Sequence, residues 1–156
     1  MVDEADEMSP KDMLDDRPGR YISHVHRQLA ALCHRKNEKG KREVLLVTSS
    51  TGRWILPKGW PMEGKTDREA ALIEAWEEAG VREGKVKRKP IGTFVSVKLS
   101  DHGDEEICVT RVFEVKAKLV LDDYPERKRR DRRWVSAKAA ARLVTEDGLR
   151  EILRDL

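Results

Sequence analysis

The chain has 156 residues, of which 39% are charged, and its formal net charge at neutral pH is +3. This length suits one domain with a hydrophobic core, and no apolar run is long enough to form a membrane-spanning helix. The N-terminal segment also lacks the apolar stretch of a secretory signal, which predicts a soluble cytoplasmic protein and argues against a membrane protein. Cys33 and Cys108 lie in apolar runs, so buried free thiols are expected.

The predicted elements begin after an acidic segment. Residues 1–20 carry many carboxylates and little to bury, so we expect a disordered or loosely docked arm. The folded domain is expected to span 21–156. Its first strands are predicted at 28–33 and 43–48, and a turn then leads into an apolar segment at 54–56.

A helix is marked clearly in the next segment. Thr66 and Glu69 have the spacing of a capping box, in which the two residues satisfy each other's backbone N–H groups. Good helix formers follow, and Gly80 is suited to the left-handed conformation that ends many helices. The pattern therefore predicts one helix that starts at this box and ends at Gly80.

The C-terminal half continues the alternation of strands and helices. Strands are predicted at 91–99, 107–115 and 131–135, followed by a helix from Ser136 to about Val144. Thr145 is the expected cap of a last helix. Such alternation predicts an α/β fold in which helices cover a mixed β-sheet.

Three carboxylates share one face of the predicted central helix. Glu74, Glu77 and Glu78 are spaced i, i+3 and i+4, which brings their side chains onto neighbouring points of the helix surface. Like charges at this spacing repel, so we expect a cation against this face. Mg²⁺ or Mn²⁺ is the best candidate, because both favour carboxylate oxygens and Mg²⁺ commonly bridges to phosphates. A merely solvated helix face is the less favoured interpretation.

The stretch from Gly59 to Val81 resembles the signature of the Nudix hydrolases, which runs from a glycine through a Glu-rich helix to a glycine and an aliphatic residue. In register with it are Gly59, Glu74, Glu77, Glu78, Gly80 and Val81. Two positions depart from it: Lys65 stands where the signature has Glu, and Ile73 where it has Arg. In the family this Glu and Arg support one another, so their joint loss indicates a replaced structural pair rather than a damaged metal site.

The resemblance implies a Nudix-type α/β/α sandwich with a mixed β-sheet and the hydrolysis of a phosphoanhydride bond. It assigns the metal to Glu74, Glu77 and Glu78, which would also make them catalytic. A metal held there would neutralise phosphate charge and lower the pKa of bound water. Positioning and charge compensation supply most of the rate in such reactions.

Three segments look most like the diphosphoinositol polyphosphate phosphohydrolases within that family. They are 31–35, 44–50 and 53–57. The implied substrate is a polyphosphorylated small molecule, either an inositol pyrophosphate or a dinucleoside polyphosphate. Trp60 and Pro61 depart from the glycine-rich loop of that subgroup and are expected to reshape the pocket edge.

Further site residues are expected outside the carboxylate helix. Arg27 and Lys58 are predicted to clamp phosphate, since guanidinium and ammonium groups bind polyphosphates well. The rest of the predicted substrate-binding set is Arg35, Gly59 and Trp60. Glu106 is the candidate general base, although a plain polar turn explains 101–106 equally well.

Two other classes of function stay open. Lys65 and Ile73 are compatible with a catalytically silent domain that binds nucleotides or other phosphorylated ligands. The cationic run 126–133 is compatible with a docking module for protein or RNA. Nucleic acid is possible as a partner but not favoured, because no RNA-binding module or stacking pattern accompanies the run.

Overall fold

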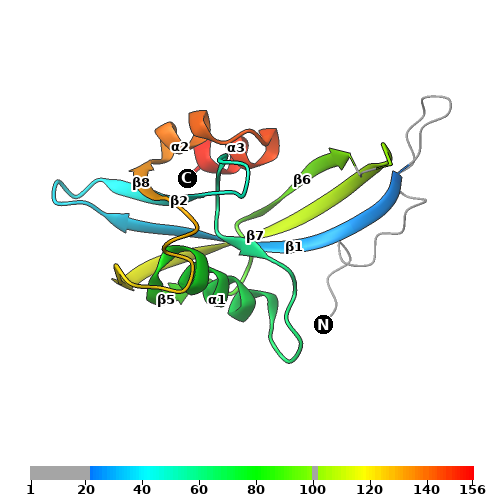
Figure 1. Cartoon of the computed structure of the whole chain (residues 1–156). Coiled ribbons are helices and arrows are strands. Elements are labelled where there is room, and N and C mark those ends of the chain that lie inside the picture. Colours follow the sequence, from blue (N-terminus) through cyan, green and yellow to red (C-terminus); the bar gives the residue numbers. More distant parts are fainter. Residues whose placement is uncertain (1–21, 100–101) are drawn as a thin grey trace.

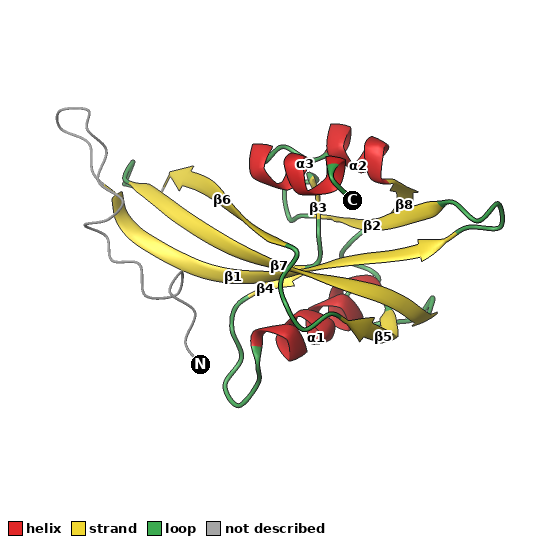
Figure 2. Ribbon diagram, turned by 180° about the vertical axis from the view of Figure 1, so that it is seen from behind, coloured by secondary structure: helices red, strands yellow, loops and turns green. Residues whose placement is uncertain are grey.

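The computed structural model describes residues 22–99 and 102–156, and the expected acidic arm lies outside them. A mixed β-sheet forms the centre of this part of the chain, with helix α1 on one face and helices α2 and α3 on the other (Figures 1 and 2). The predicted α/β sandwich is confirmed. None of these helices combines the length and apolar character needed to cross a membrane.

The sheet is built around two long strands. Its strands are β1 (Ile22–Lys36), β2 (Arg42–Thr48), β3 (Trp54–Ile55), β4 (Lys58–Gly59), β5 (Val81–Val86), β6 (Gly92–Leu99), β7 (Glu105–Val120) and β8 (Arg132–Ser136). The helices are α1 (Asp67–Ala79), α2 (Ala137–Leu143) and α3 (Asp147–Arg154). Strands β3, β2, β1, β7 and β5 follow one another across the sheet, while β4 pairs with β1, β6 with β7 and β8 with β2. The β1–β7 pair is parallel, and the other pairs are antiparallel.

Alternation along β1 divides the core into two layers, because successive side chains of a strand point to opposite faces. Leu29 and Ala31 pack in the layer under α1, together with buried alanines of that helix. Ala30 and Leu32 pack in the layer under α2 and α3. The packing of these residues therefore positions α1 on one face of the sheet. Both cysteines are buried and free, as predicted.

The ends of α1 are those predicted from the sequence. Glu69 donates its backbone N–H to Thr66 Oγ1 at 3.2 Å, and its side chain accepts from the Thr66 N–H at 2.9 Å. Gly80 closes the helix with φ 78°, a left-handed conformation that a side chain would strain. Ser136 also caps α2, as expected, by accepting from Ala139 N at 3.1 Å.

Other boundaries differ from the prediction. The prediction of Thr145 as a cap is wrong: Glu146 precedes α3, and its side chain makes no capping hydrogen bond. Strand β1 starts earlier than predicted, at Ile22, because a parallel partner along β7 extends it through a polar segment. Strand β5 was not predicted, since charged residues dominate Val81–Val86 and hide its pairing with β7.

Candidate functional site

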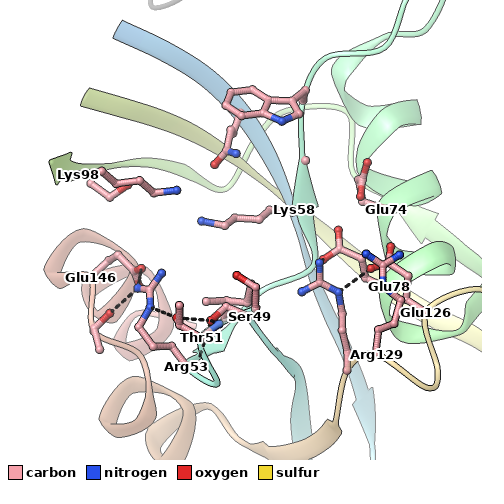
Figure 3. Close-up of a pocket in the computed structure, with 18 of the residues that line it drawn as sticks. Ser49, Thr51, Arg53, Lys58, Glu74, Glu78, Lys98, Glu126, Arg129 and Glu146 are labelled. Atoms are coloured by element: carbon pink, nitrogen blue, oxygen red, sulfur yellow. Dashed lines mark hydrogen bonds and ion pairs between the residues drawn. The ribbon is translucent and has the colours of Figure 1, made fainter. Parts of the chain in front are cut away.

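A cavity of about 1200 Å³ opens beside the N-terminal end of the motif loop. Its lining comes from β1, the loop after β2, β4 with the loop that follows it, α1, β6, the segment before β8 and the α2–α3 junction. Figure 3 shows two groups of charged side chains on opposite sides of this cavity. We call Glu74, Glu78 and Glu126 the carboxylate wall, and Arg53, Lys58, Lys98 and Glu146 the lysine wall.

Strand β4 sets the distance between the motif loop and α1. Gly59 pairs with Leu29 of β1, which places its backbone against the Glu74 carboxylate. A Cβ at this position would collide with the Glu74 carboxylate oxygens. Gly59, predicted to bind substrate, lines the cavity, and the close approach gives a packing reason for the glycine.

The carboxylate wall contains a buried acid with one oxygen that lacks a hydrogen bond in the described part of the chain. Glu78 is 2% exposed, and its Oε1 accepts no hydrogen bond from any described residue. Burial, followed by a hydrogen bond with Glu74, raises the pKa of Glu78 to about 9, although Arg130 opposes the shift. Burial also raises the pKa of Glu77, with further contributions from Glu74 and Glu126. These carboxylates lie close enough to destabilise one another's charge.

This arrangement fits a hard divalent cation. The donors are all carboxylate oxygens, which Mg²⁺ and Mn²⁺ prefer, and one buried oxygen lacks a donor. Among residues 22–99 and 102–156, no three His, Cys, Asp or Glu side chains already form a metal-binding group. Glu74 and Glu78 line the cavity, whereas Glu77 does not. Waters and substrate oxygens would complete the coordination, as is usual for Mg²⁺.

Arg130 supplies positive charge to this wall. Its Nε donates to Glu126 Oε1 at 2.8 Å, its Nη1 to the Thr48 carbonyl at 2.8 Å, and its Nη2 lies 3.4 Å from Glu78 Oε1. Arg132 donates to the Ala79 carbonyl at 2.9 Å, at the end of α1. The cationic run 126–133 therefore packs partly against α1. Sequence reasoning missed Glu126 and Arg130 as site residues, although their i, i+4 spacing was a local signal.

The lysine wall is cationic around one acid. Lys58 and Lys98 extend toward each other in Figure 3. Burial, followed by repulsion from Lys98, lowers the pKa of Lys58. Arg53 lies 3.4 Å from Glu146 Oε1, and the other oxygen of Glu146 is buried without a partner among the described residues. Lys58 was predicted, whereas the other three residues were missed because each comes from a separate segment.

Two predicted phosphate ligands lie outside the cavity lining. Arg27 Nη1 donates to Asp67 Oδ2 at 2.6 Å, and Arg111 Nη1 donates to the same oxygen at 2.7 Å. Arg35 lies 3.4 Å from Glu43 and stacks over Trp134 at 3.9 Å. Arg27 thus holds the start of α1 against the sheet, and Arg35 packs at the β1–β2 pair. Their contacts with substrate stay predictions.

The remaining predicted residues lie at the rim. Trp60 lines the cavity, is 55% exposed, and meets the His26 ring edge-on with centroids 5.6 Å apart. Glu106 lies opposite Lys98 on the paired strands and 3.6 Å from His26 Nε2. Glu106 is not among the described residues that line the cavity, and its role as a base stays a prediction.

Comparisons with known proteins agree with this architecture. A model of the NUDIX domain matches residues 26–156. Nudix hydrolase 12, mitochondrial, of Arabidopsis thaliana is 35% identical over 119 residues, which cover 74% of this chain and 58% of the relative. The C. elegans Ap4A hydrolase structure is 20% identical with a TM-score of 0.59, covering 83% of this chain and 94% of that one. The NUDIX domain of Shewanella oneidensis NrtR, complexed with ADP ribose, is 18% identical with a TM-score of 0.54, covering 95% and 98%.

The match to the curated relatives is partial in length. The aligned region covers 58% and 60% of the first two of them, so the chain spans about three fifths of their length. The solved structures are too distant in sequence to indicate more than the fold. They nevertheless share most of their length with this chain.

Proposed function

The chain belongs to the Nudix family, and from this premise we propose that it is a divalent-metal-dependent hydrolase of phosphoanhydride bonds. The observation that carries the proposal is the pairing of two opposite walls in one cavity. The carboxylate wall has a buried oxygen that calls for a cation, and the lysine wall has two ammonium groups that call for an anion. A metal–phosphate pair satisfies both walls at once.

Each wall has a distinct task in this reaction. Glu74 and Glu78, with Glu77 behind them, would hold Mg²⁺ or Mn²⁺, which when bound supplies charge neutralisation and an acidified water. Lys58 and Lys98 bind the substrate phosphates and orient the anhydride against the carboxylate wall. Partial burial of Lys58 strengthens this attraction, because the local dielectric is lower than that of water. Trp60 at the rim partly covers the bound molecule.

The substrate we propose is a polyphosphorylated small molecule, either an inositol pyrophosphate or a dinucleoside polyphosphate. The first follows from the resemblance of 31–35, 44–50 and 53–57 to the diphosphoinositol polyphosphate phosphohydrolases. The second is supported by the likeness in fold to an Ap4A hydrolase. Glu106 remains our candidate for orienting water, and a cytoplasmic location remains part of the proposal.

Activity of the purified protein tests the proposal against a silent binding domain. Dinucleoside polyphosphates, inositol pyrophosphates, capped RNA and nucleoside triphosphates would be assayed with Mg²⁺ and with Mn²⁺. Glu78→Gln is expected to lower turnover at least about 100-fold, since even residues behind metal ligands cost up to that much. Glu63→Gln, in the exposed motif loop, is the matched control and should retain full activity. Ligand binding without any turnover would identify a silent domain instead.

A further inference from the structure

Glu146 is a buried acid that neither the fold nor the metal site explains. It precedes α3 at the position where a side chain normally caps the helix, yet it makes no capping bond. Its side chain is 9% exposed and lines the cavity. Buried carboxylate oxygens almost always accept hydrogen bonds, but Oε2 of Glu146 accepts none from the described residues. An oxygen in this position calls for a donor from outside the protein.

The neighbours of Glu146 engage only its other oxygen, Oε1, among the described residues. Arg53 Nη1 lies 3.4 Å from both Glu146 Oε1 and Thr145 Oγ1, and its Nε lies 3.4 Å from Thr51 Oγ1. These contacts hold Arg53 against the loop after β2. Its guanidinium contacts one oxygen of the Glu146 carboxylate. The second oxygen has no donor among the described residues, and the Glu146 side chain lines the cavity on the side where Lys58 and Lys98 extend toward each other (Figure 3).

The charges around Glu146 restrict what the donor can be. Lys58, Lys98 and Arg53 attract an anion into this wall and repel an ammonium group. A neutral hydroxyl avoids that repulsion and still donates to a carboxylate. Carboxylates serve the same purpose for ribose hydroxyls in other nucleotide-binding folds. The wall as a whole therefore suits a molecule in which a phosphate and a hydroxyl stand side by side.

We propose that Glu146 is a specificity residue whose Oε2 accepts a hydrogen bond from a substrate hydroxyl, while Lys58 and Lys98 hold a phosphate of the same molecule. The inference rests on the proposed function and assigns to Glu146 the recognition of the ribose or cyclitol ring that both proposed substrates carry. Inorganic polyphosphate, which lacks the hydroxyl, is disfavoured. Glu146 lies across the cavity from Glu74 and Glu78, which separates its task from that of the metal site.

The test compares substrates with and without hydroxyl groups. Glu146→Gln keeps an oxygen for Arg53 and turns an N–H₂ toward the cavity, so the acceptor becomes a donor at nearly unchanged volume. The kcat/KM of ADP-ribose, of a dinucleoside tetraphosphate and of an inositol pyrophosphate is expected to fall about 10-fold or more, as for the loss of a charged hydrogen bond. The kcat/KM of inorganic tripolyphosphate should stay within about twofold. The ribose and cyclitol arms identify which ring the site prefers.

The matched control is Asp147→Asn, which removes an adjacent carboxylate that is 93% exposed. This control should leave the kcat/KM of every substrate unchanged. Thermal unfolding of each variant reports whether the fold is intact. An equal fall for tripolyphosphate and the ring-bearing substrates would overturn the inference, because a general base or a structural residue acts on all of them. Unchanged kcat/KM for all of these substrates would overturn it as well.

Calorimetry keeps the two proposals separate. If no anhydride is hydrolysed, the proposed function fails, while the dissociation constant of ADP-ribose still tests Glu146. We expect weaker binding by Glu146→Gln than by the unaltered chain and by Asp147→Asn. Equal affinity in all three proteins would refute the role of Glu146 whatever the outcome for hydrolysis.

Discussion

The two walls of the cavity are built in opposite ways. The carboxylate wall draws Glu74 and Glu78 from one turn of α1 and Glu126 from the segment before β8, whereas the lysine wall gathers its residues from four separate segments. Charges of the opposite sign lie at both walls: Arg129 and Arg130 beside the first, and Glu146 within the second. The difference teaches that most of the proposed cation site comes from one helix, whereas the proposed anion site depends on how distant segments meet.

The largest expected effect comes from removing the charge of the lysine wall. Lys58→Met should lower kcat/KM for a phosphoanhydride about 100-fold, since a buried ammonium contact to phosphate is worth about 1.5–3 kcal/mol. Steady-state kinetics at saturating Mg²⁺ measure it. Lys65→Met, an exposed change in the motif loop, is the control and should leave kcat/KM unaltered. Full kcat/KM in the Lys58→Met enzyme would show that Lys58 does not bind the substrate phosphates.

The next effect concerns Asp67, which anchors the start of α1 to the sheet. Asp67→Asn weakens two charge-assisted bonds, to Arg27 and Arg111, and leaves two partly buried guanidiniums close together. A loss of about 3 kcal/mol in the free energy of unfolding is expected from breaking such a network. Asp122→Asn removes an exposed partner of Arg132 and serves as the control. Urea denaturation that fails to separate the two variants would show that Asp67 does not anchor the helix.

Arg130→Met should destabilise the metal-free protein by a smaller amount. About 2 kcal/mol is expected, because the Glu126 carboxylate and the Thr48 carbonyl each lose a partly buried donor. This corresponds to a fall of about 4–8 °C in Tm for a chain of this size. Added Mg²⁺ should restore more Tm to this variant than to the unaltered chain, since a cation replaces the missing charge. If scanning calorimetry shows the same Mg²⁺-induced rise in Tm for both proteins, Arg130 and the metal do not balance the same charge.

The last prediction is a pH dependence of the metal-free protein. The folded state raises the pKa of Glu78 to about 9, above its ordinary value of 4.5, so the folded state binds more protons between these pH values. Stability should therefore decrease as pH rises from about 4.5 toward 9 and show no further loss from Glu78 beyond that. Thermal unfolding in chelator would follow the slope, which Glu78→Gln should flatten. A slope unchanged by this substitution would assign it to other groups.

Local signals explain what could be predicted about the fold and the site. Thr66, Glu69 and Gly80 mark the ends of α1 because caps act through backbone groups a few residues away. Glu74 and Glu78 face the same cavity because helix geometry alone aligns residues four apart. The apolar runs likewise predicted the strands of the central sheet, except β3, β4 and β5.

Strand register explains why Gln28 lines the cavity and its neighbour Arg27 does not. Arg27 and Gln28 are consecutive polar residues of β1, and alternation sends them to opposite faces. Gln28 lines the cavity, whereas Arg27 binds Asp67 on the α1 side. Two polar neighbours give no hydrophobic pattern that could say which one faces the cavity. The pairing of β1 with β7 and the packing of α1 against the sheet decide which one does.

The sequence by itself determined the carboxylate helix, its caps and the order of alternating strands and helices, because these depend on contacts a few residues apart. Tertiary structure decided which cations face that helix, and it buried Glu146 beside Lys58 and Lys98. The physical reason is that charge acts through space and desolvation, and both depend on which segments the sheet brings together.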